Sequence, residues 1–113
     1  MTLLSFKIVG FRSELEDLRR DGFRDVERCN QILDRVESAP LLIDIARTMA
    51  STGQTKLAKK AFLRCRDLII DLQGRDQTDA LKQFTKAIER AGGFEKMGID
   101  KGDEAALLRL LLR

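Results

Sequence analysis

The side chains that could act as nucleophiles, general bases or metal ligands are few and scattered in this 113-residue chain. It contains no histidine, which excludes the usual transition-metal sites and histidine-dependent acid–base catalysis. Ser5, Ser13, Ser38 and Ser51 therefore have no histidine to activate them. The phosphate-binding motifs GxGxxG and GxxxxGK(S/T) are both absent. The sequence predicts a protein that is not an enzyme and that holds no cofactor or metal.

The two cysteines offer no obvious redox or metal chemistry. Cys29 and Cys65 are far apart, lack CxxC spacing, and each occupies a position where a small apolar residue would fit a helix face. We expect two buried free thiols, because a free cysteine behaves as a small apolar residue. Unpaired thiols suit a reducing compartment, so we predict a cytoplasmic protein.

Positive charge is concentrated in the second half of the chain. Residues 54–113 have 13 basic and 9 acidic side chains, whereas residues 1–53 have 8 and 9. A run without acids contains five cations: Lys56, Lys59, Lys60, Arg64 and Arg66. Such a run can attract nucleic-acid phosphate or an acidic peptide, although an ordinary solvated helix face looks similar. Phosphate binding by the first four of these cations, in a nucleic-acid-binding module, is the alternative function.

The elements that must position these side chains are all expected to be helices. Apolar residues recur every three to four positions in nearly every segment from Glu14 onward, which predicts an all-α fold with at least five helices and no sheet. The expected helices begin at 14 and then cover about 23–37, 40–51, 54–73 and 77–91, with Asp76 as the cap of the last of these. A short helix should begin near 94, and Asp103 should cap a final helix. Residues 2–9 fit a helix or a short strand, and we favour the helix because no second strand is evident.

Two stretches of the chain share one local pattern. In each, a bulky residue precedes a small or short one, an apolar residue follows, and a glycine ends the helix. The residues are Ile45, Ala46, Met49 and Gly53 in the first copy, and Phe84, Thr85, Ile88 and Gly92 in the second. The two glycines are 39 residues apart, a spacing typical of stacked helix pairs. Over about residues 39–99 the chain resembles a degenerate tetratricopeptide-type helical repeat.

The resemblance implies antiparallel helical hairpins stacked in a short array, and a simple helical bundle is the alternative. The whole chain, 1–113, would be one domain: N-terminal helices in 1–38, a hairpin over 39–74, a partial repeat over 75–99, and a C-terminal helix over 103–113. Small side chains at Ala46 and Ala58 would let the two hairpin helices approach closely.

The resemblance also implies a groove lined by the first helix of each hairpin. The outward positions would be Ile43, Asp44, Arg47, Ala50 and Ser51 in one helix, and Asp79, Lys82, Gln83, Lys86 and Arg90 in the other. The cations Arg47, Lys82, Lys86 and Arg90 would form a basic strip suited to an acidic segment of a partner protein. An ordinary solvated face at i, i+4 spacing has the same appearance. The main functional prediction is a non-catalytic protein–protein interaction adaptor.

The C-terminal segment has more apolar residues than one helix face can hold. Five of its residues are leucines: Leu107, Leu108, Leu110, Leu111 and Leu112. We predict a homodimer through this helix, chiefly by Leu107, Leu108 and Leu111, because exposed apolar side chains favour association. The competing interpretation is that the helix plugs the open end of the last hairpin, as a terminal cap does in a repeat protein.

No segment resembles a membrane or export sequence. Residues 1–14 are too short and too interrupted by polar residues for a secretory signal. No apolar run approaches the length needed to cross a bilayer. We therefore expect no membrane association.

Overall fold

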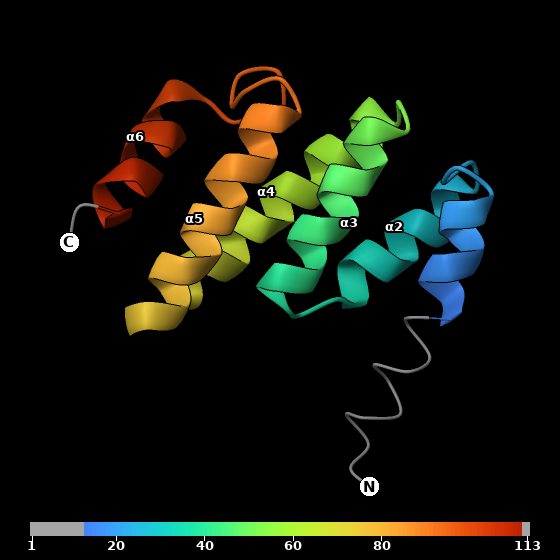
Figure 1. Cartoon of the computed structure of the whole chain (residues 1–113), viewed down its shortest axis with the longest axis horizontal. Helices are drawn as coiled ribbons and strands as arrows, with labels where there is room; N and C mark the ends of the chain where they lie inside the picture. The colour runs from blue at the N-terminus through green and yellow to red at the C-terminus, as the bar shows by residue number, and fades with distance from the viewer. Residues whose placement is uncertain (1–12, 112–113) are drawn as a thin grey trace, which may run out of the picture.

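The computed structural model describes residues 13–111, and all of the regular secondary structure in that range is helical (Figure 1). A helix covers residues 13–20. It is followed by α2 (Val26–Arg35), α3 (Ala39–Ser51), α4 (Thr55–Asp71), α5 (Gly74–Arg90) and α6 (Lys101–Leu111). The predicted all-α fold is therefore confirmed. The expectation for residues 2–9 lies outside the described residues.

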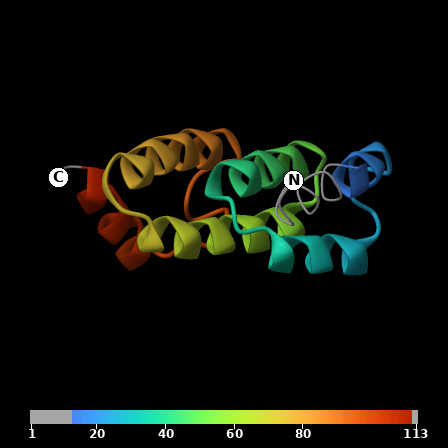
Figure 2. The ribbon, with the colours of Figure 1, turned by 90° about the horizontal axis from the view of Figure 1, so that it is seen from below.

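The helices are arranged in two layers (Figure 2). The helix of residues 13–20, α3 and α5 lie side by side in the first layer, and α2 and α4 lie in the second. The closest packing joins α3 to α4, while α5 contacts both of them and α2 contacts α4. α6 packs on α5 and covers one end of the array. α3 consequently separates the helix of residues 13–20 from α5 within the first layer.

The α3–α4 hairpin follows directly from its local sequence. The Ser38 hydroxyl oxygen caps α3 by accepting a hydrogen bond from the Leu41 N–H at 3.4 Å. At the other end Gly53 has φ +85°, a conformation that glycine adopts without strain. The chain can then reverse into α4. Ala46 and Ala58 are fully buried, as expected for small residues where two helices approach closely.

Three phenylalanine rings connect the central helices. The ring centroids of Phe62 on α4 and Phe84 on α5 are 5.8 Å apart, and the rings meet edge to face. Phe84 also meets Phe94 edge to face, at 6.1 Å. Such aromatic pairs contribute about 0.5–1.5 kcal/mol beyond the burial of their area. They join α4, α5 and the turns after α5 into one apolar core.

The start of α2 differs from its prediction. Phe23 is not helical: its φ is +58° and its side chain is buried. The N–H of Phe23 donates to the Leu18 carbonyl oxygen at 2.8 Å, which closes the turn at the end of the preceding helix. α2 begins at Val26. The Asp25 side chain caps it by accepting a hydrogen bond from the Arg28 N–H. Val26, the first residue of α2, is half exposed and does not contribute to the core.

Other local predictions were also wrong at helix ends. α5 begins at Gly74, so Asp76 lies inside its first turn and does not cap it. Residues 94–98 form turns and not a helix. Asp100 caps α6 by accepting a hydrogen bond from the Asp103 N–H at 2.8 Å, so the Asp103 carboxylate can contact another residue.

One prediction within a helix was also wrong. Ile43, expected to face outward, is buried because α3 is covered on more than one side.

Candidate protein-binding face

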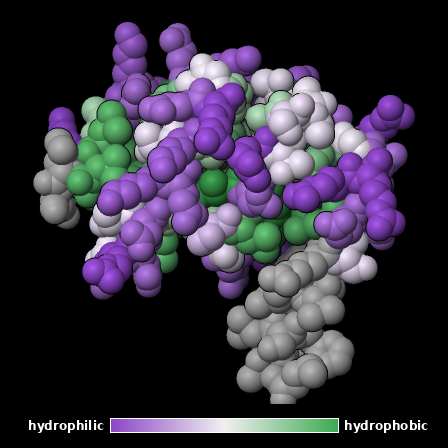
Figure 3. Space-filling model, in the orientation of Figure 1, coloured by the Kyte–Doolittle hydropathy of each residue, from purple (hydrophilic) through white to green (hydrophobic). Residues whose placement is uncertain are grey.

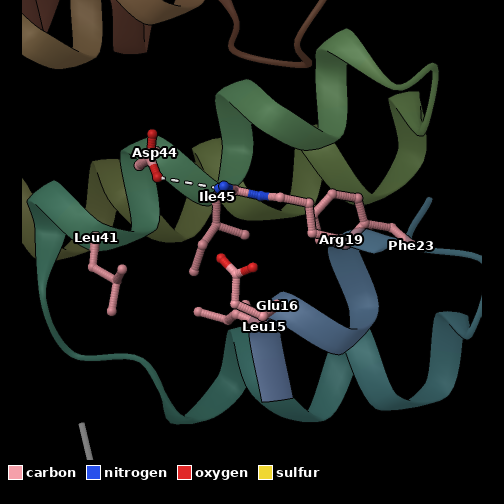
Figure 4. Close-up of a pocket in the computed structure, with 7 residues that line it drawn as sticks. All are labelled: Leu15, Glu16, Arg19, Phe23, Leu41, Asp44 and Ile45. Carbon is pink, nitrogen blue, oxygen red and sulfur yellow. Dashed lines mark hydrogen bonds and ion pairs between the residues drawn. The ribbon is translucent and has the colours of Figure 1, made fainter. Parts of the chain in front are cut away.

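A cavity of about 420 Å³ lies between the helix of residues 13–20 and α3 (Figure 4). We call it the α3 pocket. Its lining combines four apolar side chains with three charged ones: Leu15, Phe23, Leu41 and Ile45, and Glu16, Arg19 and Asp44. An apolar cavity with a few charged groups at its border is the usual form of a binding site.

Long-range contacts hold the pocket walls in place. The Glu14 carboxylate lies 3.0 Å from Arg35 and 3.6 Å from Arg28, which ties the helix of residues 13–20 to α2. The Gln54 side-chain amide donates to the Gly22 carbonyl oxygen at 3.2 Å, so the turn before Phe23 is fixed against the α3–α4 loop. Phe23 is thereby held in the lining of the pocket.

The charges at the pocket are unequally paired. The Asp44 carboxylate lies 2.7 Å from the Arg47 guanidinium and 3.5 Å from that of Arg19. Arg19 also donates to the Thr48 hydroxyl oxygen at 3.4 Å. Glu16 is exposed and has no ion pair with any described residue. The border of the pocket therefore has one uncompensated negative charge, on the side farthest from α5.

Lys82, Lys86 and Arg90 occupy the exposed face of α5, and we call them the α5 strip. They follow one another at i, i+4 spacing, so they lie on one side of the helix. Among the described residues none of the three makes an ion pair or a side-chain hydrogen bond. The strip is flanked by exposed Asp79 and Glu89.

The four residues predicted to line the groove thus lie in one layer of the molecule. Arg47 projects from α3 and the α5 strip from the neighbouring helix. Arg47 differs from the strip because it is already paired with Asp44. Figure 3 shows this face with hydrophilic side chains along α5 and hydrophobic surface between the helices beside them.

Half of the alternative phosphate-binding set is engaged within the molecule. Lys60 Nζ lies 3.0 Å from Asn30 Oδ1 and 3.3 Å from Asp34 Oδ1. The Arg64 guanidinium donates to the Asp34 and Val36 carbonyl oxygens at 3.1 and 3.0 Å. These two cations therefore join α4 to the C-terminal end of α2.

The remaining members of the 54–66 run behave differently from one another. Arg66 pairs with Asp103 at 2.6 Å and with Asp67 at 3.1 Å. Lys56 and Lys59 are exposed and make no ion pair within the described residues. Two of the four proposed phosphate ligands are therefore free to meet a ligand.

The C-terminal leucines differ in how far they are exposed to solvent. Leu107 is 1% exposed and belongs to the core of the chain itself. Leu110 and Leu111 are partly buried against that core, and Leu108 is 37% exposed. Leu112 lies outside the described residues.

The remaining candidates for chemistry are the two cysteine thiols and any metal-binding group. Cys29 and Cys65 are buried free thiols, and burial raises the pKa of both. Residues 13–111 contain no group of three or more side chains arranged to hold a metal ion. None of the described helices is both long and apolar enough to cross a membrane.

Sequence reasoning identified the α5 strip but missed the α3 pocket. The stripe containing Leu15 and Leu18 resembles any buried helix face. Nothing in the sequence distinguishes Leu15, which borders a cavity, from Leu18, which is fully covered. The left-handed conformation of Phe23 likewise could not be predicted from the sequence.

Comparison with known proteins found no matching family model, no matching curated protein and no matching solved structure.

Proposed function

We propose that this protein is a non-catalytic adaptor whose first helical layer binds an acidic segment of a partner protein. The observation behind the proposal is that Lys82, Lys86 and Arg90 make no ion pair within the part of the chain that the structure describes. Most cations in the middle of the chain already contact an acid or a carbonyl oxygen: Arg19, Arg28, Arg47, Lys60, Arg64 and Arg66. The three strip cations lie on one helix face and, like Lys56 and Lys59 on α4, remain available to a negative ligand.

The arrangement of the helices supports the same proposal. α3 and α5 lie side by side in one layer, as the first helices of successive tetratricopeptide-type hairpins would. In such an array the exposed side chains of neighbouring first helices meet one bound segment. The tetratricopeptide resemblance remains part of the proposal.

Nucleic-acid binding through α4 is the second candidate. Lys56 and Lys59 remain available for phosphate, and each phosphate contact releases bound counterions. Lys60 and Arg64 would have to leave α2 to join them, which would expose the end of that helix. Because of this requirement, we favour the adaptor over nucleic-acid binding.

We also propose self-association through α6, now centred on Leu108. Leu107 is already covered within one chain, which favours the plug interpretation for that residue. Leu108, with partly buried Leu111 beside it, would supply the apolar contact between two copies.

The adaptor proposal can be tested with fluorescein-labelled glutamate-rich peptides and a labelled DNA oligonucleotide, measured by fluorescence anisotropy. The triple variant Lys82→Gln/Lys86→Gln/Arg90→Gln should weaken peptide binding about tenfold or more, because it removes three charge contacts. The matched control is Lys56→Gln/Lys59→Gln, which removes two exposed cations from α4.

The two variants separate the two candidates. If the α5 triple variant binds acidic peptide as tightly as the wild type does, the adaptor proposal is wrong. If DNA binding is strong and only the α4 control variant loses it, the nucleic-acid module is the correct function.

A further inference from the structure

We propose that the α3 pocket and the α5 strip bind one extended partner peptide that has an apolar anchor residue and, about four residues away, acidic residues. This inference rests on the proposed function, because it specifies the partner of the same face. It adds a second point of attachment that acidic recognition alone does not require. The partner is thus a bipartite segment and not any acidic chain.

The position of the pocket supports a single ligand. The pocket lies between the helix of residues 13–20 and α3, and the strip lies on α5, the next helix in the same layer (Figures 1 and 4). A peptide crossing the layer would pass over Arg47 on its way from one to the other. Pocket and strip are therefore parts of one continuous face.

The spacing of the motif follows from helix packing. Packed helices are about 8–10 Å apart, so the pocket lies about 12–15 Å from α5. An extended chain covers at most about 3.3–3.6 Å per residue. The first acid must therefore be about four positions from the anchor, with three residues between them.

The charges of this face favour one order of residue types. An acid next to the anchor would meet Glu16, which lacks an ion-pair partner among the described residues, whereas Arg19 and Asp44 at the same border already neutralise each other at 3.5 Å. A lysine or arginine beside the anchor would instead compensate Glu16. The preferred peptide has a basic residue, an apolar anchor, an uncharged spacer and then two acids, read in either chain direction.

The anchor must be a large apolar side chain. Leu15, Leu41 and Ile45 give the cavity an apolar wall, and its volume of about 420 Å³ leaves room for a leucine, methionine or phenylalanine side chain. Burial of such a side chain supplies an affinity that salt does not screen. Binding should accordingly retain a salt-resistant part.

The test uses synthetic peptides in which each part is changed separately. The parent peptide has lysine, leucine, three small uncharged residues and two glutamates, made in both chain directions. One derivative replaces the leucine with serine, a second replaces the glutamates with glutamine, and a third shortens the spacer to one residue. We expect the first derivative to bind about ten- to hundredfold more weakly than the parent, and the third to lose most of its affinity.

Two readouts on the protein locate the anchor. In ¹³C-methyl spectra the Ile45 signals should shift with the parent peptide but not with the serine derivative. The Glu16→Lys variant should bind the parent several-fold more weakly and recover when the peptide lysine is replaced by glutamate. Asp17→Lys is the matched control, because Asp17 is exposed on the same helix but does not line the pocket.

The outcomes distinguish this inference from the proposed function. If the serine derivative binds like the parent and the Ile45 methyl signals do not move, the anchor is overturned while acidic recognition by α5 stands. If no acidic peptide binds, or the α5 triple variant binds normally, the proposed function fails and the bipartite motif fails with it.

Discussion

The Arg66 guanidinium and the Asp103 carboxylate are joined at 2.6 Å across 37 residues of sequence. Arg66 belongs to α4 and Asp103 to the first turn of α6, so this pair fastens the terminal helix to the body of the array. The pair is only partly exposed. Arg66, one of the five cations in the acid-free run of the sequence, therefore has a structural role.

Removing this pair should loosen α6. We expect Asp103→Asn to lower the free energy of unfolding by about 1 kcal/mol, because a short charge-assisted contact is weakened while solvent screening limits its value. Asp67→Asn is the matched control, since Asp67 contacts the same arginine from the same helix and joins no two elements. Urea unfolding measures both, and equal losses would contradict a fastening role for Asp103.

Ala58 should tolerate no larger side chain. It is fully buried in α4, where α3 and α4 pack most closely. We expect Ala58→Leu to cost about 1–3 kcal/mol through overpacking. Ala106→Leu on the exposed side of α6 should change stability little. A melting temperature for Ala58→Leu equal to that of the wild type would show that the hairpin has space at this position.

Arg64 should matter for stability and not for ligand binding. Arg64→Met leaves the Asp34 and Val36 carbonyl oxygens without their side-chain donor, and we expect a loss of about 1–2 kcal/mol. Part of that loss is offset because the Arg64 Nε is buried without a hydrogen-bond partner among residues 13–111. Lys56→Met, an exposed change in the same helix, should stay within about 0.5 kcal/mol. Denaturant unfolding compares the two, and a neutral Arg64→Met would contradict this role.

The α6 leucines give opposite predictions for folding and association. Leu107→Ala should destabilise the chain by about 2–5 kcal/mol, because Leu107 is buried in the core. Leu108→Asp should leave the fold intact and reduce self-association, measured by light scattering over a range of concentrations. A wild-type protein that stays monomeric at every concentration would reject the dimer and leave α6 as a terminal plug.

The buried thiols predict how stability changes at alkaline pH. Burial raises the pKa of Cys65 and that of Cys29 above the value of about 8.5 for an unfolded thiol. Above that pH the unfolded state releases protons that the folded state retains. Stability is therefore complete below about pH 8.5 and falls as pH rises. Cys65→Ala should flatten the fall, measured by urea unfolding from about pH 8 to 9.5, and an unchanged slope would contradict the assignment.

The sequence by itself determined the class of fold and the positions of most helices. Apolar spacing, the Ser38 cap and the turn at Gly53 act over a few residues, so they could be read without knowledge of the packing. The same locality explains the error at Asp76. Its side chain was plausible as a cap, but α5 begins at Gly74 without a side-chain cap.

Only the tertiary structure decided which charged residues are available to a ligand. Lys60 and Arg64 face α2, whose partner groups are about 30 residues away along the chain, whereas Lys82 and Lys86 make no ion pair among the described residues. These four cations look alike in the sequence. The α3 pocket likewise depends on how two helices and the turn at Phe23 are placed in space. Local periodicity fixes which face of a helix is apolar, but the packing of whole helices fixes what that face and its charged borders meet.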